Sequence, residues 1–145
     1  MSASSAIRYE QTIPDVLQAM AGVHELLNNN GLDTKIRQLV QLRASQINRC
    51  GFCVKMHIRE ARQNGETSDR LDRVIVWDQV NDFTDAEKAA LERTEALTDL
   101  HMKSNHGAIR ARLSEHISDA HHRISVLLRI CDRDCRALPI EYSAR

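Results

Sequence analysis

Two thiols and an imidazole follow one another at helical spacing in the first half of the chain. Cys50, Cys53 and His57 are separated by three and four residues, and on a helix such intervals place side chains on one face, with Cβ atoms about 5–6 Å apart. The other members of this stripe are the apolar residues Val54, Ile58 and Ala61. A stripe that is otherwise apolar should face a core or a cleft rather than open water. The pattern therefore predicts a redox dithiol with its own acid/base.

The spacing of the two cysteines permits a dithiol cycle. Cysteine reacts as the thiolate, and a free thiol has a pKa of about 8.5. The helix dipole would lower the pKa of Cys50, which is nearest the helix start, whereas a protonated His57 would act on Cys53. These two influences leave open which thiol attacks. Once one thiol is oxidised to a sulfenic acid, the other can close a disulfide, because Cα atoms three residues apart on a helix fall within the usual span of about 4.4–6.8 Å.

Two other interpretations of these residues compete with redox chemistry. The cysteines could be small core residues, or Cys50, Cys53 and His57 could supply three ligands to zinc, which needs a fourth ligand in a structural site. The available fourth ligands lack a paired motif and are His101, His106, His116, His121 and His122. Cys131 and Cys135 are interpreted as incidental. We therefore expect neither a metal nor a cofactor at the dithiol.

Composition limits the partners of the chain. Its 145 residues suit one domain with a real core. The 20 basic and 20 acidic residues balance, so charge gives no reason to expect nucleic acid or a membrane surface as a partner. The N-terminus lacks the apolar core of a signal peptide, and no stretch approaches the roughly 18 apolar residues of a membrane span. We expect a cytoplasmic protein, in which cysteines are reactive or metal-binding rather than joined in structural disulfides.

Helical periodicity runs through most of the chain, and alternating β-branched runs are absent, which argues against a sheet. We expect an all-α single domain of six or seven helices over residues 13–136, after a loose lead-in at 1–12 and before a tail at 137–145. Its helices are expected over about 13–28, 34–48, 50–64, 68–77, 84–100 and 108–136, the last broken near 118–119. The boundary signals are Asp33 or Thr34, a break at Asn48-Arg49, Gly65, Ser68, the capping box Thr84–Glu87 and a loop at Lys103–Gly107.

Three segments closely resemble the core of the AhpD-like alkylhydroperoxidases, which belong to the carboxymuconolactone decarboxylase superfamily. They are residues 39–48 (LVQLRASQIN), the motif Cys50-x-x-Cys53-x-x-x-His57, and residues 61–66, which carry Ala-Arg and Gly-Glu. The likeness extends from about Leu32 to Leu100. It implies an all-helical fold that assembles into trimers or hexamers.

The resemblance also implies an activity. It implies a thiol-dependent peroxidase that reduces organic hydroperoxides or hydrogen peroxide and is recycled by an unidentified protein or thiol reductant. By analogy, Cys53 would be the peroxidatic thiol, Cys50 the resolving thiol and His57 part of the proton relay. The other activity of the superfamily, decarboxylation of a muconolactone, belongs to a branch without the Cys-x-x-Cys pair, so the two cysteines argue against it.

The chain departs from this family pattern at three places. Relatives with a known relay carry a glutamate twelve residues before the first cysteine, where this chain has Gln38, which cannot act as a general base. A water, His57 alone or a carboxylate elsewhere would have to take that role. Many relatives have glycine just before the first cysteine, where this chain has Arg49. The last thirty or so residues do not follow the family, which puts the family's mode of assembly in question for this chain.

The leading hypothesis is therefore an AhpD-like dithiol peroxidase. The alternative within the same fold is a general thiol–disulfide oxidoreductase whose natural oxidant is not a peroxide. The alternative from another class is a non-catalytic helical binding or assembly protein, in which Cys50, Cys53 and His57 hold zinc or are simply packed.

Overall fold

The computed structural model describes residues 9–29, 32–99, 104–117 and 124. Within these ranges the chain forms α-helices and one 3₁₀-helix and no strand, which confirms the expected all-α fold. The elements are α1 (Tyr9–Thr12), α2 (Pro14–Asn29), α3 (Thr34–Ile47), α4 (Gly51–Gln63), α5 (Ser68–Arg73), the 3₁₀-helix η1 (Val74–Gln79), α6 (Asp85–Thr98) and α7 (His106–His116). In the described part of the chain, no helix combines the length and the hydropathy that crossing a bilayer requires.

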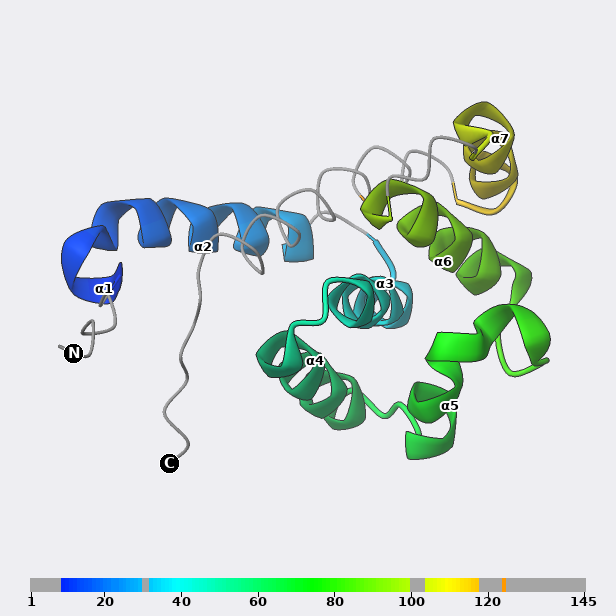
Figure 1. Cartoon of the computed structure of the whole chain (residues 1–145), viewed down its shortest axis with the longest axis horizontal. Coiled ribbons are helices and arrows are strands. Elements are labelled where there is room, and N and C mark those ends of the chain that lie inside the picture. Colours follow the sequence, from blue (N-terminus) through cyan, green and yellow to red (C-terminus); the bar gives the residue numbers. More distant parts are fainter. Residues whose placement is uncertain (1–8, 30–31, 100–103, 118–123, 125–145) are drawn as a thin grey trace, which may run out of the picture.

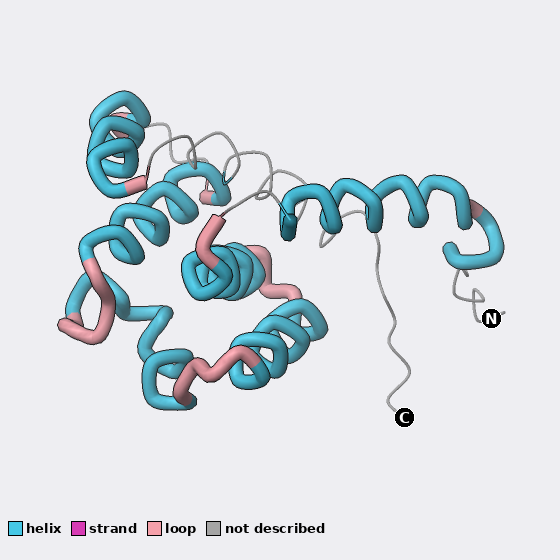
Figure 2. The backbone as a smooth tube through the Cα atoms, turned by 180° about the vertical axis from the view of Figure 1, so that it is seen from behind, coloured by secondary structure: helices cyan, strands magenta, loops and turns pink. Residues whose placement is uncertain are grey.

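Helix α3 is the central element of the bundle (Figure 1). Both α4 and α6 pack against α3, and α7 packs against α6. The chain passes from α4 to α6 through α5 and η1, and η1 also contacts α3. Helices α1 and α2 extend to one side of this bundle as an arm (Figures 1 and 2). Helix α3 therefore supports α4, which carries the predicted dithiol, from the inside of the bundle.

Two apolar clusters form the core, and α3 contributes to both. The first cluster consists of Val40, Ala44, Ala89, Ala90, Leu113 and Ile124. The second consists of Leu39, Leu42, Ala61, Leu71, Val74, Phe83 and Leu91. A helix that is apolar on more than one face is one that its neighbours bury. The second cluster includes Ala61 of α4, so burial of this residue fixes which face of α4 points inward.

Capping residues in the sequence set several helix boundaries. Asp33 caps α3 by accepting hydrogen bonds from two backbone amides of the first turn, at 2.9 and 3.1 Å. Thr84 and Glu87 form the capping box at the start of α6. Gly65 follows the end of α4 with φ of 87°, a left-handed conformation that glycine adopts without steric cost. These three boundary predictions are confirmed.

The structure differs from the expected elements in the N-terminal segment and in the segment over residues 68–77. A one-turn helix, α1, forms in the segment expected as a loose lead-in. The helix expected over residues 68–77 is divided into α5 and η1, and Thr67 rather than Ser68 caps it. Val76 lies outside the helical region, with φ of −123°. The β-branched run Val74–Val76 accounts for the division, because such side chains crowd the preceding turn of an α-helix.

The C-terminal helical region begins earlier than expected. Helix α7 starts at His106, inside the expected loop over residues 103–107, because the side chain of Asn105 caps it by accepting from the backbone N of Ala108 at 3.1 Å. The expected helix over 108–136 is confirmed as far as His116. Ile117 is the C-cap of α7, with extended backbone. Apart from the buried helical residue Ile124, the rest of the expected helix lies outside the described residues, as does the expected tail.

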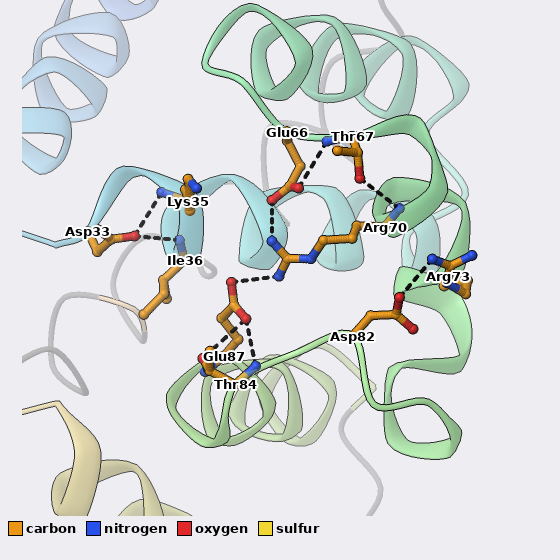
Figure 3. A network of polar contacts seen from close by, with 10 residues as sticks. All are labelled: Asp33, Lys35, Ile36, Glu66, Thr67, Arg70, Arg73, Asp82, Thr84 and Glu87. Atoms are coloured by element: carbon orange, nitrogen blue, oxygen red, sulfur yellow. Dashed lines mark hydrogen bonds and ion pairs between the residues drawn. The ribbon is translucent and has the colours of Figure 1, made fainter.

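Arg70 links the α4–α5 connection to α6. Its guanidinium donates to Oε2 of Glu66 at 2.9 Å and to Oε1 of Glu87 at 2.8 Å (Figure 3). Both carboxylates are buried. Since Glu87 also belongs to the capping box, Arg70 joins the connection after α4 to the start of α6.

Candidate functional site

Cys50 and Cys53 lie at the start of α4, where their sulfur atoms are joined in a disulfide. Cys50 is the N-cap residue, with extended backbone, and its Sγ accepts a hydrogen bond from the backbone N of Cys53 at 3.3 Å. The two Cα atoms are 5.3 Å apart, inside the usual span of about 4.4–6.8 Å for a disulfide. The structure thus brings the two predicted thiols together at the positive end of the helix dipole.

The chain turns sharply between α3 and α4 and so presents Cys50. Arg49 has φ of 56°, in the left-handed region, which confirms the expected break before α4. The backbone N of Cys50 donates to the carbonyl oxygen of Ser45 at 3.1 Å and closes this turn. A residue with a Cβ pays roughly 1–2 kcal/mol for a left-handed conformation. Glycine would therefore suit position 49 better than arginine, as in the relatives with glycine there.

Cys53 and His57 face the core from the same side of α4. Only 8% of Cys53 and 6% of His57 are exposed, and Ala61, one turn further on, is completely buried. Cys50 is half-buried at the N-cap. Val54 and Ile58 are partly buried beside the second core cluster. The expected stripe therefore faces the core, and Cys50 is at its more accessible end.

A shallow groove follows the neighbouring side of α4. Its lining consists of Gly51, Val54, Lys55, Ile58, Arg59, Arg62 and Gln63. The three cationic residues among them are exposed, and the groove begins at the residue that follows Cys50 in the chain. The surface next to this end of the disulfide therefore combines apolar and positively charged side chains.

His57 has a carboxylate partner on its own helix. Its Nδ1 lies 3.1 Å from Oε2 of Glu60. Burial lowers the pKa of His57 below its usual 6.5, although the hydrogen bond and the negative charge of Glu60 act to raise it. Electrostatic interaction with His24 on α2 and with Arg37 on α3 also lowers the pKa of His57. Burial thus favours the neutral imidazole, which is the form that can accept a proton.

Gln38 is the residue at whose position the resemblance to AhpD-like proteins implies a relay glutamate. It is buried on α3, and its Nε2 donates a long hydrogen bond of 3.4 Å to the backbone carbonyl of Glu60. The amide thus contacts the turn of α4 that carries Glu60 and His57. Glu60 is absent from the site residues expected from the sequence, although its spacing of three residues from His57 is the signal that could have identified it.

The other histidines and cysteines considered from the sequence are not gathered at this site. Among the described residues, no group of three or more His, Cys, Asp or Glu side chains is arranged to hold a metal ion. His106 and His116 lie on α7, where both are exposed. The remaining candidates are outside the described residues and are His101, His121, His122, Cys131 and Cys135.

The family model for carboxymuconolactone decarboxylases matches residues 14–96, from the start of α2 into α6. The chain belongs to the carboxymuconolactone decarboxylase family. The matched segment includes both cysteines of the disulfide, His57, Glu60 and Gln38. The site therefore lies within the part of the chain that defines the family.

Two relatives of this family member are uncharacterized bacterial proteins. YdfG of Bacillus subtilis (strain 168) is 29% identical over 125 residues, which cover 86% of this chain and 85% of YdfG. YnjA of Escherichia coli (strain K12) is 35% identical over 85 residues, which cover 59% of this chain and 46% of YnjA.

A solved structure of an AhpD-like protein is similar to this chain. A protein of unknown function from Agrobacterium tumefaciens, provisionally identified as the antioxidant defence protein AhpD, matches with a TM-score of 0.87. The two chains are 25% identical, and the match covers 98% of this chain and 100% of the other. The AhpD-like fold is thereby confirmed.

Proposed function

We propose that the protein is a thiol-dependent peroxidase that reduces organic hydroperoxides or hydrogen peroxide. The observation that carries the proposal is the cysteine pair at the start of α4, already close enough to be joined, with His57 one turn beyond Cys53 on the same buried face. A dithiol that only held the fold together would not need a buried imidazole beside it. Membership of the family and the AhpD-like neighbour agree with this assignment.

The proposed cycle starts from the reduced pair. Neutral His57 takes the proton of the Cys53 thiol, and the thiolate attacks one peroxide oxygen. The O–O bond breaks, Cys53 becomes a sulfenic acid, and the departing alkoxide takes the proton back from the imidazolium. The Cys50 thiol then attacks the sulfenic sulfur, which releases water and forms the disulfide. In sum, two thiols and one hydroperoxide give one disulfide, one alcohol and one water.

Return to the dithiol requires an external thiol or a protein reductant. Thiol–disulfide exchange proceeds by attack on an accessible sulfur, and Cys50 is the more exposed of the two cysteines. We therefore assign the mixed disulfide with the reductant to Cys50, with Cys53 leaving as the thiolate. The proposal places the protein in the cytoplasm, because such a cycle needs a reducing compartment.

Thiol titration before and after one equivalent of an organic hydroperoxide tests the proposed function. The reduced protein is expected to lose two thiols rapidly, and peptide mapping by mass spectrometry should find them joined as Cys50–Cys53. The same titration with a disulfide reagent in place of the peroxide is the comparison. Rapid oxidation by the disulfide reagent together with slow oxidation by the peroxide would replace the peroxidase proposal with a general oxidoreductase. Slow loss with both, or oxidation spread over Cys131 and Cys135, would exclude dithiol catalysis.

We also propose that the protein forms a homo-oligomer, as the trimers and hexamers of the resembling family suggest. Helix α2 exposes apolar side chains on one face, namely Val16, Val23 and, with 64% of its surface exposed, Leu26. Several exposed apolar side chains on one face of a helix suit a protein interface.

Leu26→Lys is therefore expected to weaken self-association by about tenfold or more, since burying a leucine contributes about 1.5–3 kcal/mol. Light scattering coupled to size-exclusion chromatography, over a range of concentrations, measures the change. Gln18→Lys is a matched control, because Gln18 is also exposed on α2 but lies on another face. An equal effect of both substitutions, or of neither, would argue against an interface at Leu26.

A further inference from the structure

The carboxylate of Glu60 makes a contact that has consequences for the tautomer of His57. An ionised carboxylate can only accept hydrogen bonds, so the 3.1 Å contact between Oε2 of Glu60 and Nδ1 of His57 requires the proton on Nδ1. A neutral imidazole has one N–H, and the other nitrogen, Nε2, is then the base. The contact thus selects the tautomer in which Nε2 is free to accept a proton.

The burial of the two partners differs in a way that suits this role. His57 is buried, whereas 44% of the Glu60 side chain is exposed. The negative charge of Glu60 stabilises the imidazolium that forms when His57 takes a proton. Among the charged groups acting on His57, His24 on α2 and Arg37 on α3 oppose that form, and Glu60 favours it.

Gln38 connects this pair to the central helix. Because its amide donates to the backbone carbonyl of Glu60, it contacts the turn of α4 from which the carboxylate extends. A glutamate at position 38 would have no N–H to donate and would place a second acceptor against that carbonyl. Gln38 cannot serve as a base, but it makes a hydrogen bond to the carbonyl of Glu60 that a glutamate at position 38 could not make.

We propose that Glu60 is the positioning residue for His57 and supplies the carboxylate that the amide of Gln38 cannot. The inference rests on the proposed peroxidase function, in which His57 is the base for Cys53. Glu60 holds the imidazole with Nε2 unprotonated, and it stabilises the imidazolium until the alkoxide product takes the proton. Gln38 supports the backbone of Glu60 and does not enter the chemistry.

Two substitutions separate the orienting effect of Glu60 from the effect of its charge. Glu60→Ala removes both, whereas Glu60→Gln keeps an acceptor oxygen of similar reach and removes only the charge. In ¹⁵N NMR spectra of the reduced protein, we expect the Nδ1–H tautomer of His57 in the wild type, loss of that preference in Glu60→Ala, and its partial retention in Glu60→Gln. The tautomer is read without peroxide, so this arm does not depend on activity.

The kinetic arm measures the rate constant for oxidation of the dithiol by an organic hydroperoxide as a function of pH. We expect the plateau to fall about tenfold in Glu60→Ala, a part of the roughly 10²–10⁴ that a positioned acid/base contributes, and to fall less in Glu60→Gln. His57 must be neutral to act as a base, so the rate rises as pH increases through its pKa. Since Glu60 raises that pKa, both variants should shift the acidic limb to lower pH, despite their slower plateau.

Glu115→Ala on α7 is the matched control, because Glu115 is an exposed helical glutamate, and it should change neither the tautomer nor the pH profile. An unchanged tautomer and an unchanged pH limb in Glu60→Ala would overturn the inference. If the wild type did not react with the hydroperoxide, the proposed function would fail, and the NMR arm alone would then decide whether Glu60 positions His57. Should Glu60→Ala fail to fold, Glu60→Gln still tests the charge through the pH limb.

Discussion

Replacing Cys53 with serine is expected to abolish peroxide consumption, with a fall of about a thousandfold or more in the rate constant. A serine hydroxyl at this position would not ionise near neutral pH, and His57 one turn away cannot turn it into a nucleophile comparable to a thiolate. The substitution is nearly isosteric, and only 8% of Cys53 is exposed, so the packing of α4 should be preserved. Stopped-flow or coupled assays of hydroperoxide loss measure the effect.

Cys50→Ser is expected to give a different result. Without the resolving thiol, Cys53 should react once and remain a sulfenic acid, which a dimedone-type reagent would trap for mass spectrometry. The burst should equal one peroxide per chain, with no further turnover. Cys131→Ser serves as the control and should turn over like the wild type. The opposite pattern, with a trapped sulfenic acid on Cys50 in Cys53→Ser, would reverse the two roles. It would show that the N-cap position and helix dipole outweigh His57 in selecting the nucleophile.

Much of the scaffold is predictable because its signals are local. Asp33, the Thr84–Glu87 capping box and Gly65 each act within one turn of the helix they begin or end, so the sequence places those boundaries correctly. The buried face of α4 is equally predictable, because the spacing of Cys53, His57 and Ala61 alone determines that they share one stripe. At η1, apolar spacing alone predicts one helix over residues 68–77. It does not account for the β-branched side chains of Val74–Val76, which crowd the preceding turn of an α-helix.

The partners within the site are harder to predict because they depend on side-chain conformation and on distant contacts. Glu60 is one of several charged residues near His57 on α4, and only its rotamer shows that it reaches Nδ1. The contact between Gln38 and the carbonyl of Glu60 joins residues 22 positions apart, and it requires knowing how α3 crosses α4. The lack of a carboxylate at position 38 is visible in the sequence, but the contact of Glu60 with His57 is visible only in the fold.

Arg70→Met is expected to destabilise the protein by about 3 kcal/mol or more, because it leaves buried carboxylates without their cation. The side chains of Glu66 and Glu87 are only 5% and 9% exposed, and Arg70 donates to both of them. Its guanidinium also lies 5.0 Å from the ring centre of Phe83, which adds a cation–π contact. Urea denaturation followed by circular dichroism measures the loss of unfolding free energy.

Arg73→Met is the matched control for that experiment, since Arg73 pairs with Asp82 at 2.7 Å in a more exposed setting, where solvent screens the charges and the loss should be much smaller.

Adding Glu66→Gln and Glu87→Gln to Arg70→Met should recover much of the lost stability. The glutamine side chains can still accept hydrogen bonds from the backbone N of Thr67 and of Thr84, but they leave no unpaired charge in the buried site. Equal losses in Arg70→Met and Arg73→Met, or no recovery in the triple variant, would mean that the buried charges are not what Arg70 stabilises. Because Arg70 donates to Glu66 and Glu87 rather than to Cys53 or His57, the dithiol of the folded single variant should still react with peroxide at the wild-type rate. This result would separate the structural role of Arg70 from the chemistry of Cys53 and His57.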